Sequence, residues 1–351
     1  MHSLNRCRRM RLNSNTPYLF LNVINHCATL QQFNFYLLVY PIMINTRLST
    51  LTPIKHPLLQ HHSILAWMKR DDLIHPWLSG NKGRKLRDTL KLAKTQHRTT
   101  LISFGGCFSN HLYALAGAGQ LFGFQTVGII RGEADPDNPT LKWLIKQGMV
   151  CHFVTRQTYQ QRHDQAYQAM WQARYPNSMV IPEGGYAPAA MAGVGDIIEE
   201  LSTHDYDMLC CAVGSGTTLA GLAYANRGQR QLWGFCALKN AHYLEDNINH
   251  LQRAYGKQAY PFSLSHDDHH GGFAKAPPAL IDLTADFSKQ TGIPIEPIYT
   301  GKMVAGVFNK IQQGQFVSGS KLVLLHTGGL QGSQGLAYLS AKRALKRQQQ
   351  R

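Results

Sequence analysis

A hydrophobic strand, a glycine-rich turn and the start of a helix follow one another in residues 208–221, MLCCAVGSGTTLAG. Residues 208–213 are continuously apolar, as is typical of a strand buried on both faces of a parallel sheet. Gly214 and Gly216 then permit a tight turn, and residues 217–225 continue as a predicted helix. This order of strand, turn and helix indicates a fold built from βαβ units.

The same alternation extends over most of the chain. Amphipathic helical patterns separate short apolar segments, which predicts a buried, mostly parallel sheet. We therefore expect an α/β fold, in which ligands bind at the carboxyl ends of the strands. Further strands are expected at residues 63–69, 99–104, 126–130, 150–154, 179–181, 232–238 and 321–325, and further helices at 82–94, 110–121, 141–147, 159–174, 195–201 and 243–255.

The charge of the chain is concentrated at its two ends. The 351 residues are 44% hydrophobic, enough for one large domain or two ordinary ones. Of the net charge of +16, eight Lys or Arg precede the first acid, Asp71, and eight follow the last, Glu296. The 20 remaining bases balance the 20 acids. Basic ends on a neutral body indicate solvated tails, so we expect neither nucleic-acid nor membrane binding; nucleic-acid binding through those ends is the alternative.

Cysteine and histidine usage points to a reducing compartment and to no metal. The seven cysteines are an odd number without a C-x-x-C pair, which indicates the cytoplasm. The run of residues 266–270, HDDHH, lacks the spacing of metal ligands, so we interpret it as a polar loop near the site. Cys107 is interpreted as a small packing residue and not as a reactive thiol.

The first 42 residues form a segment apart. They contain four arginines, no acid and an apolar run at residues 33–42 that is too short and interrupted to span a bilayer. An arginine-rich segment without acids is typical of an organellar transit peptide. Alternatively, translation begins at Met43, where globular sequence starts. We favour the second interpretation and expect residues 1–42 to be an extension outside the core.

A lysine stands at the start of the expected helix 82–94, in Ser79-Gly80-Asn81-Lys82-Gly83-Arg84-Lys85-Leu86. Gly80 and Asn81 are turn and cap residues, which places Lys82 in the first helical turn. There the helix dipole and the neighbouring Arg84 and Lys85 disfavour a charged ammonium. A lysine that loses its proton easily is suited to imine formation.

Two glycine-rich loops follow predicted strands. In Gly214-Ser215-Gly216-Thr217-Thr218, converging N–H groups, hydroxyls and a helix N-terminus predict a phosphate site, although tight packing also explains such glycines. In residues 104–111, FGGCFSNH, Ser109 or Asn110 is expected to cap the following helix, and both can also contact a ligand there. No serine lies in a G-x-S-x-G elbow, which argues against a hydrolase triad.

Together these features resemble one family of pyridoxal-phosphate enzymes. It is the group of 1-aminocyclopropane-1-carboxylate deaminases and D-cysteine desulfhydrases, which have the tryptophan-synthase β-like fold, or fold type II. The matching pieces occur in family order over roughly residues 64–330, and they are residues 69–73, 80–86, 105–111, 214–221, 299–303 and 326–329.

The resemblance implies a role for each matching residue. Lys82 would hold the cofactor, pyridoxal 5′-phosphate, through a covalent bond and move the proton at the substrate Cα. Asn110 would contact the ring hydroxyl of the cofactor, and Ser109 the substrate carboxylate or its reacting carbon. Tyr299 would line the substrate side. The phosphate would be held by Gly214, Ser215, Gly216, Thr217 and Thr218.

Two positions depart from the ring-opening deaminases of this family. Those enzymes resemble one another in carrying a glutamate after the tyrosine, where this chain has Thr300, and the later H-x-G-G motif here contains Thr327, as in desulfhydrase-like members. A neutral hydroxyl beside the pyridine nitrogen leaves the ring a weaker electron sink, which suits loss of a β leaving group better than cyclopropane opening. Phe273 stands where relatives carry a tyrosine.

The resemblance therefore implies a cytoplasmic, homodimeric enzyme with two α/β domains and the cofactor between them. Residues 43–87 and 188–345 would form the large cofactor-binding domain, and residues 88–187 the small one. The expected reaction is α,β-elimination on a small amino acid such as D-cysteine, giving pyruvate, ammonia and sulfide. One alternative is ring opening of 1-aminocyclopropane-1-carboxylate to 2-oxobutyrate and ammonia. Another is a cofactor-binding protein without turnover, which Phe273 would allow.

Overall fold

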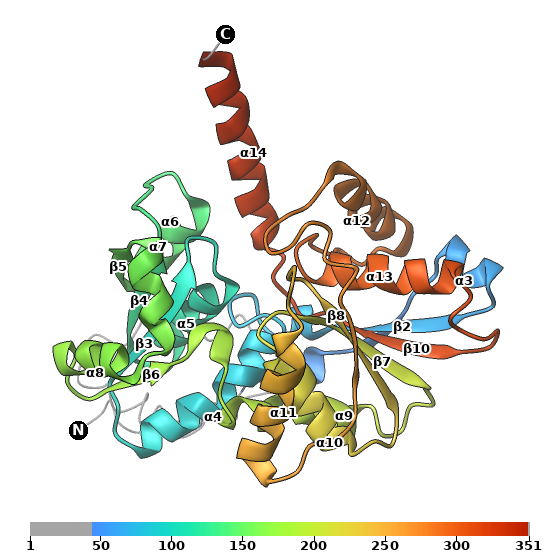
Figure 1. The fold of residues 1–351 in the computed structure, drawn as a ribbon, viewed down its shortest axis with the longest axis horizontal. Coiled ribbons are helices and arrows are strands. Elements are labelled where there is room, and N and C mark those ends of the chain that lie inside the picture. The colour runs from blue at the N-terminus through green and yellow to red at the C-terminus, as the bar shows by residue number, and fades with distance from the viewer. Residues whose placement is uncertain (1–43, 350–351) are drawn as a thin grey trace, which may run out of the picture. The chain divides into compact units, whose positions relative to one another are not determined.

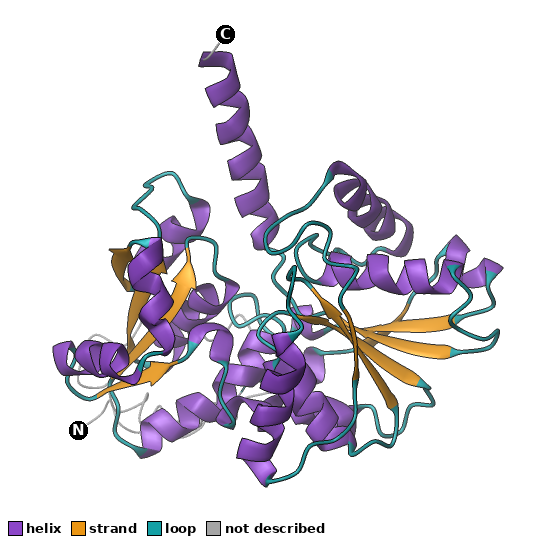
Figure 2. Cartoon of the chain, in the orientation of Figure 1, coloured by secondary structure: helices purple, strands orange, loops and turns teal. Residues whose placement is uncertain are grey.

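The computed structural model describes residues 44–349, and these contain two separate β-sheets flanked by helices (Figures 1 and 2). The expectations for residues 1–42, and for a start at Met43, lie outside the described residues. Within the described part of the chain, no helix combines the length and the apolar character needed to cross a bilayer.

The larger sheet has six strands in the order β1-β2-β10-β7-β8-β9. Its pairs are parallel except that of β1 with β2, and β1 lies at the edge, where Pro53 removes no hydrogen bond from the centre of the sheet. The central strands are the apolar runs that the sequence predicted. The strands are β1 Leu51–Pro53, β2 Leu65–Lys69, β7 Met208–Val213, β8 Gln231–Cys236, β9 Ser263–Ser265 and β10 Lys321–Leu325.

The smaller sheet has four parallel strands in the order β5-β4-β3-β6. All four come from residues 100–181, within the range that the sequence predicted for a small domain. The boundaries of that domain, at residues 88 and 187, stay a prediction. The strands are β3 Thr100–Gly106, β4 Gln125–Arg131, β5 Val150–Val154 and β6 Ser178–Ile181.

Helices cover the sheets, and α4, α5, α6, α10 and α11 begin within two residues of their predicted starts. Ser109 and Asn138 cap their helices by accepting hydrogen bonds from first-turn N–H groups. The helices are α3 Pro57–His61, α4 Asn81–Thr95, α5 Asn110–Phe122, α6 Pro139–Lys146, α7 Arg156–Gln160, α8 Gln165–Arg174, α9 Ala189–Glu200, α10 Thr217–Asn226, α11 Tyr243–Gly256, α12 Pro278–Thr291, α13 Thr300–Gln312 and α14 Gly332–Gln349.

The structure corrects the sequence prediction at several elements. The single helix expected at residues 159–174 is wrong, because Asp164 adopts an extended backbone and its side chain caps α8 at the N–H of Tyr167. Helix α9 starts at Ala189, six residues before its predicted start at Gly195. The sequence analysis missed β1, β9, α3, α12, α13 and α14. The last of these shows that the expected C-terminal tail is helical as far as Gln349, although residues 340–345 and 347–349 are exposed.

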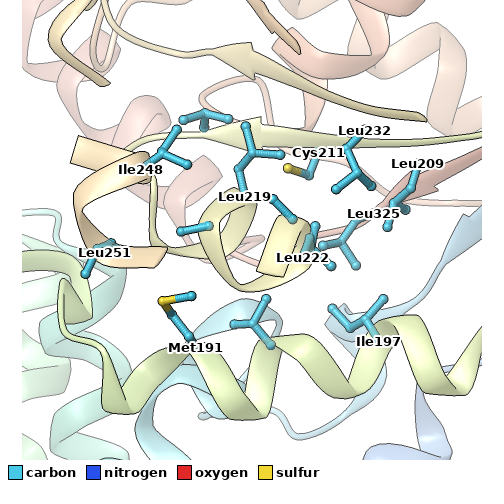
Figure 3. Close-up of a cluster of buried hydrophobic side chains, with 14 of the residues drawn as sticks. Met191, Ile197, Leu209, Cys211, Leu219, Leu222, Leu232, Ile248, Leu251 and Leu325 are labelled. Carbon is cyan, nitrogen blue, oxygen red and sulfur yellow. The ribbon is translucent and has the colours of Figure 1, made fainter. Parts of the chain in front are cut away.

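A hydrophobic cluster packs α9, α10 and α11 against one face of the larger sheet (Figure 3). Leu209, Leu232 and Leu325 come from the adjacent strands β7, β8 and β10, and Leu219 and Leu222 come from α10. Burying one such side chain contributes about 1.5–3 kcal/mol. The cluster therefore holds the N-terminus of α10 firmly at the carboxyl end of β7.

A buried ion network fixes the first turn of α4. The Arg84 guanidinium donates to both carboxylate oxygens of Asp71, at 2.7 and 2.8 Å, and to both of Glu200, at 2.9 and 2.8 Å. Lys69 also pairs with Glu200 at 2.7 Å, and the Ser49 hydroxyl donates to Asp71 at 2.6 Å. Two cations thus face two anions, which offsets the cost of removing these charges from water.

Replacing Asp71 with Asn leaves Arg84 buried with one carboxylate instead of two. We expect the free energy of unfolding to fall by about 3 kcal/mol, as when other buried ion pairs lose a partner. Chemical denaturation followed by circular dichroism measures this change. Asp137→Asn is the matched control, because Asp137 pairs with Lys142 at 3.4 Å on the surface, where ion pairs contribute little. Equal losses in the two variants would contradict the importance given to Asp71.

Candidate active site

A cavity of about 1000 Å³ lies at the carboxyl ends of strands from both sheets. Its lining comes from loops and helix starts that are far apart in the sequence, as expected for an α/β fold. Nine of the predicted site residues line this one cavity, and they are Lys82, Ser109, Asn110, Gly214, Ser215, Gly216, Thr218, Tyr299 and Thr327. Thr217 and Thr300 do not line it; both are fully buried behind its wall.

Lys82 lies in the first turn of α4, as predicted, and the turn before it is held by backbone contacts. Gly80 has a positive φ of 65°, and a Cβ atom there would lie 2.0 Å from the Thr327 carbonyl oxygen, so only glycine fits. The Asn81 N–H donates to that same oxygen at 3.3 Å, and the Asn81 side chain donates to the Thr218 hydroxyl at 2.9 Å. The start of α4 is thereby tied to the end of β10 and to the start of α10.

The pKa of the Lys82 ammonium is lowered to about 8 by desolvation. The direction agrees with the sequence prediction, which did not name burial as the cause and gave Arg84 a part that it does not have. Arg84 carries its charge into the ion network with Asp71 and Glu200, so it is neutralised. Burial is the cause of the shift, and it makes the free amine of Lys82 far more abundant near neutral pH than that of an ordinary lysine with a pKa of 10.5.

The loop between β7 and α10 presents unsatisfied N–H groups. Gly216 precedes α10 with a φ of 84°, and no side chain caps the first turn of that helix. The hydroxyls of Ser215 and Thr217 lie 3.1 Å apart, and Thr217 also approaches the Gly185 carbonyl at 3.5 Å. Uncapped N–H groups at a helix N-terminus favour an anion.

Two buried polar residues beside this loop escaped the sequence analysis as site residues. Lys85 lines the cavity; burial, and secondly the charge of Lys82, hold the pKa of its ammonium well below the ordinary value. Within residues 44–349, the only hydrogen bond of the Lys85 Nζ is a long one of 3.5 Å to the Gly184 carbonyl. His111 accepts or donates at Nε2 with Ser103 at 3.0 Å, and its Nδ1 has no partner among the described residues. The spacing of Lys85, three residues after Lys82 on one helix face, was the available signal.

Ser109 and Asn110 lie where α5 meets the cavity. The Ser109 hydroxyl accepts from the Leu112 N–H at 3.2 Å, so the predicted capping role is confirmed. The Asn110 side-chain oxygen accepts from Gln331 at 3.1 Å, and a Cβ on Gly329 would lie 2.6 Å from the Asn110 amide nitrogen. Asn110 therefore packs against the loop that follows β10.

Tyr299 faces the glycine loop from the other side. A Cβ on Gly214 would lie 3.0 Å from the Tyr299 ring, and burial raises the pKa of the phenol.

Glu296, which the sequence analysis did not select, accepts hydrogen bonds from the backbone N–H groups of residues 298–300 at 2.6–3.1 Å. Burial raises the pKa of this carboxyl to about 8, against the lowering by those donors. The hydroxyl of Thr300, behind the wall, lies 3.5 Å from that of Thr327, which lines the cavity.

The loop after β9 brings Phe273 to the cavity. The Phe273 ring meets the Tyr299 ring edge-on with 6.3 Å between centroids, and half of the side chain is exposed. Lys302 anchors the loop, since its ammonium donates to the carbonyls of Gly272 at 2.7 Å and Ala237 at 3.1 Å. In the described ranges, no three His, Cys, Asp or Glu side chains are grouped so as to hold a metal ion.

The donor set of the cavity fits a phosphorylated aldehyde. A lysine with a lowered pKa can bond to the carbonyl carbon through its free amine, and the uncapped start of α10 beside the buried Lys85 can hold a dianion. The unpartnered Nδ1 of His111 is a further polar atom that a ligand can satisfy.

Comparisons with known proteins agree with this donor set. A sequence profile described as "Pyridoxal-phosphate dependent enzyme" matches residues 43–328. The bifunctional D-cysteine desulfhydrase/1-aminocyclopropane-1-carboxylate deaminase of Arabidopsis thaliana is 26% identical over 290 residues, which cover 76% of this chain and 72% of that protein. The D-cysteine desulfhydrase of Yersinia enterocolitica is 25% identical over 285 residues, covering 75% of this chain and 86% of that protein.

The fold agrees with solved structures at lower identity. The crystal structure titled as an ACC deaminase homologue superposes with a TM-score of 0.75 at 22% identity, covering 86% of this chain and 98% of the other. A threonine deaminase from Solanum lycopersicum superposes with a TM-score of 0.62 at 14% identity, covering 85% of each chain. These structures share the two-sheet α/β fold described above.

The lowered pKa of Lys82 predicts how its reactivity depends on pH. In the folded chain freed of bound ligand, the rate of Lys82 acetylation should reach half its maximum near pH 8, because only the free amine reacts. Mass spectrometry of the labelled peptide measures this rate. The same lysine in urea is the control, since unfolding returns its pKa to 10.5 and shifts the curve upward. Coincident curves would show that the fold does not perturb Lys82.

Proposed function

Because the chain belongs to the family of pyridoxal-phosphate dependent enzymes, we propose that it catalyses α,β-elimination on a small amino acid, D-cysteine or a close relative. D-Cysteine and water would give pyruvate, ammonia and sulfide. The observation that carries this proposal is that Lys82, with its lowered pKa, shares one cavity with the uncapped start of α10 and the N-terminus of α5. Relatives named D-cysteine desulfhydrase support the choice of substrate.

We assign the cofactor-binding roles as follows. When bound, pyridoxal phosphate supplies the electron sink that makes the proton at the substrate Cα acidic. The N–H groups of residues 214–218 and the Lys85 side chain would hold the phosphate, since the N–H groups are uncapped and a bound dianion favours the protonated form of Lys85, which has only one long hydrogen bond of its own. Asn110 would contact the ring hydroxyl. The Thr327 hydroxyl, with Thr300 behind it, would face the ring nitrogen.

On the substrate side, the chain would orient the amino acid and exchange one proton. Ser109 and the N-terminus of α5 would bind the α-carboxylate, because the helix start favours an anion. Lys82 would take the proton from Cα, because its lowered pKa leaves more of the amine unprotonated near neutral pH than in an ordinary lysine. Tyr299 would close the cavity beside Gly214 and keep water out.

The residues near the ring nitrogen favour elimination over ring opening. Ring opening needs a strong electron sink, and Thr300 places a hydroxyl where the ring-opening members carry a glutamate. Glu296, the buried acid in this region, already accepts hydrogen bonds from three backbone N–H groups. Ring opening stays the second candidate, because relatives from Pyrococcus furiosus and Thermotoga maritima are named putative 1-aminocyclopropane-1-carboxylate deaminases.

We also propose that the protein is a homodimer and acts in the cytoplasm. The five cysteines in the described part of the chain form no disulfide, which supports a reducing compartment. The Arabidopsis relative is named mitochondrial, so cell fractionation decides between compartments. Light scattering of the purified protein decides the oligomeric state.

Lys82→Ala should abolish the yellow absorbance of covalently held pyridoxal phosphate and its fixation by borohydride. The reason is that alanine has no amine to bond to the cofactor aldehyde. Lys91→Ala is the control, because Lys91 is exposed on the same helix and should leave the absorbance intact. Borohydride fixation at another lysine in the Lys82 variant would refute the assignment.

The two candidate reactions are separated by their products. We expect pyruvate from D-cysteine at a kcat/KM at least about 10-fold above that of 2-oxobutyrate from 1-aminocyclopropane-1-carboxylate, a difference of about 1.4 kcal/mol in transition-state binding. Keto-acid release coupled to lactate dehydrogenase, with chromatography of the products, measures both. The reverse preference would establish ring opening as the function.

A further inference from the structure

A cluster of charged side chains at the edge of the cavity is not used by the proposed reaction. Arg131 ends β4, directly beside Gly106 of β3. A Cβ on Gly106 would lie 3.7 Å from an Arg131 guanidinium nitrogen, so the guanidinium lies over the loop that leads to Ser109. Arg131 is exposed and lines the cavity, and no carboxylate among residues 44–349 pairs with it.

The neighbours of Arg131 hold its side chain in place without neutralising it. Its guanidinium lies 5.5 Å from the centre of the Tyr159 ring, and that of Arg162 lies 4.9 Å from the same ring. Glu183, beside Tyr159, accepts from Arg162 at 2.5 Å and from the Tyr159 hydroxyl at 2.7 Å, and Asp135, four residues after Arg131, accepts from Tyr338 and Lys342. Glu183 is therefore committed to Arg162, and the charge of Arg131 is left over.

The whole cavity, like the surroundings of Arg131, has more basic side chains than acidic ones. Seven Lys or Arg line it against two acids, Glu183 and Glu296. Both acids are engaged, Glu183 by Arg162 and Glu296 by backbone N–H groups. Lys82 and Lys85 have places in the proposed chemistry. The cations without an acidic partner in the described chain are Arg131, Arg156, Lys275 and Arg343.

We propose that Arg131 binds a negatively charged β-substituent of the substrate, so that the preferred amino acids carry an anionic group such as phosphate, sulfate or carboxylate on that side chain. This inference rests on the proposed function, which assigns the α-carboxylate to Ser109 and the N-terminus of α5. Arg131 lies farther out, exposed, beside the same loop. A guanidinium suits such a group, because its planar fork can bind two oxygens at once.

The test compares two amino acids, one with an anionic group on the β-carbon and one with hydrogen in its place. The holoenzyme is titrated with 2-amino-3-phosphonopropionate and with alanine, in both enantiomers, by calorimetry and by the change in cofactor absorbance. We expect the phosphonate to bind at least about 10-fold more tightly than alanine, and Arg131→Gln to weaken the phosphonate alone by about 10- to 100-fold. Arg131→Lys should retain part of the preference.

Controls separate this inference from a change of fold or of function. Arg253→Gln removes an exposed arginine outside the cavity and should change neither affinity. Circular dichroism checks that the Arg131 variants are folded, and Arg131→Lys serves if Arg131→Gln is not. An equal loss for both ligands would mean that Arg131 binds the α-carboxylate, and no preference for the phosphonate would mean that no anion subsite exists; either result overturns the proposal. Pyruvate release from β-chloroalanine, whose substituent is neutral, tests the elimination reaction independently.

Discussion

The contact between Arg84 and its two carboxylates is the constraint on which the site depends. Arg84 stands two residues after Lys82 in α4. Of its two partners, Asp71 precedes α4 and Glu200 is the last residue of α9. If this network moved, the first turn of α4 would move with it, and the Lys82 amine would lose its place. The same guanidinium could have lowered the pKa of Lys82 by repulsion, but its charge is cancelled within the network. Burial is left as the cause that makes Lys82 a nucleophile.

Close backbone contacts complete what the ion network begins. Where α4 crosses α9, a Cβ on Gly193 would lie 2.3 Å from the Arg84 carbonyl oxygen. The Thr327 carbonyl likewise leaves no room for a side chain at Gly80. Such approaches bring three chain segments, residues 80–85, 214–218 and 326–329, around one cavity. Glycine is needed there for space as much as for conformation, and no single segment contains the site.

The net charge of the chain does not show how its charges are distributed over the molecule. The chain between its basic ends is neutral, yet the cavity is lined by seven bases and two acids. A cationic cavity in a neutral body attracts small anions without attracting polyanions along the surface. That arrangement fits an enzyme whose cofactor carries a phosphate and whose substrates carry carboxylates.

The sequence determined the α/β class, because apolar strands and amphipathic helices are local patterns, and it placed the central strands and α4, α5 and α10 to within a few residues. It also singled out Lys82, Ser109, Asn110 and the loop at Gly214, since each follows or begins such an element. Only the tertiary structure decided that Lys85, His111 and Glu296 join them and that Thr217 and Thr300 lie behind the wall. It also decided that Arg84 is neutralised while Arg131 is not. The physical reason is that burial and ion pairing depend on contacts between residues more than one hundred positions apart, such as Arg84 with Glu200, and no local pattern records which partner a side chain will meet.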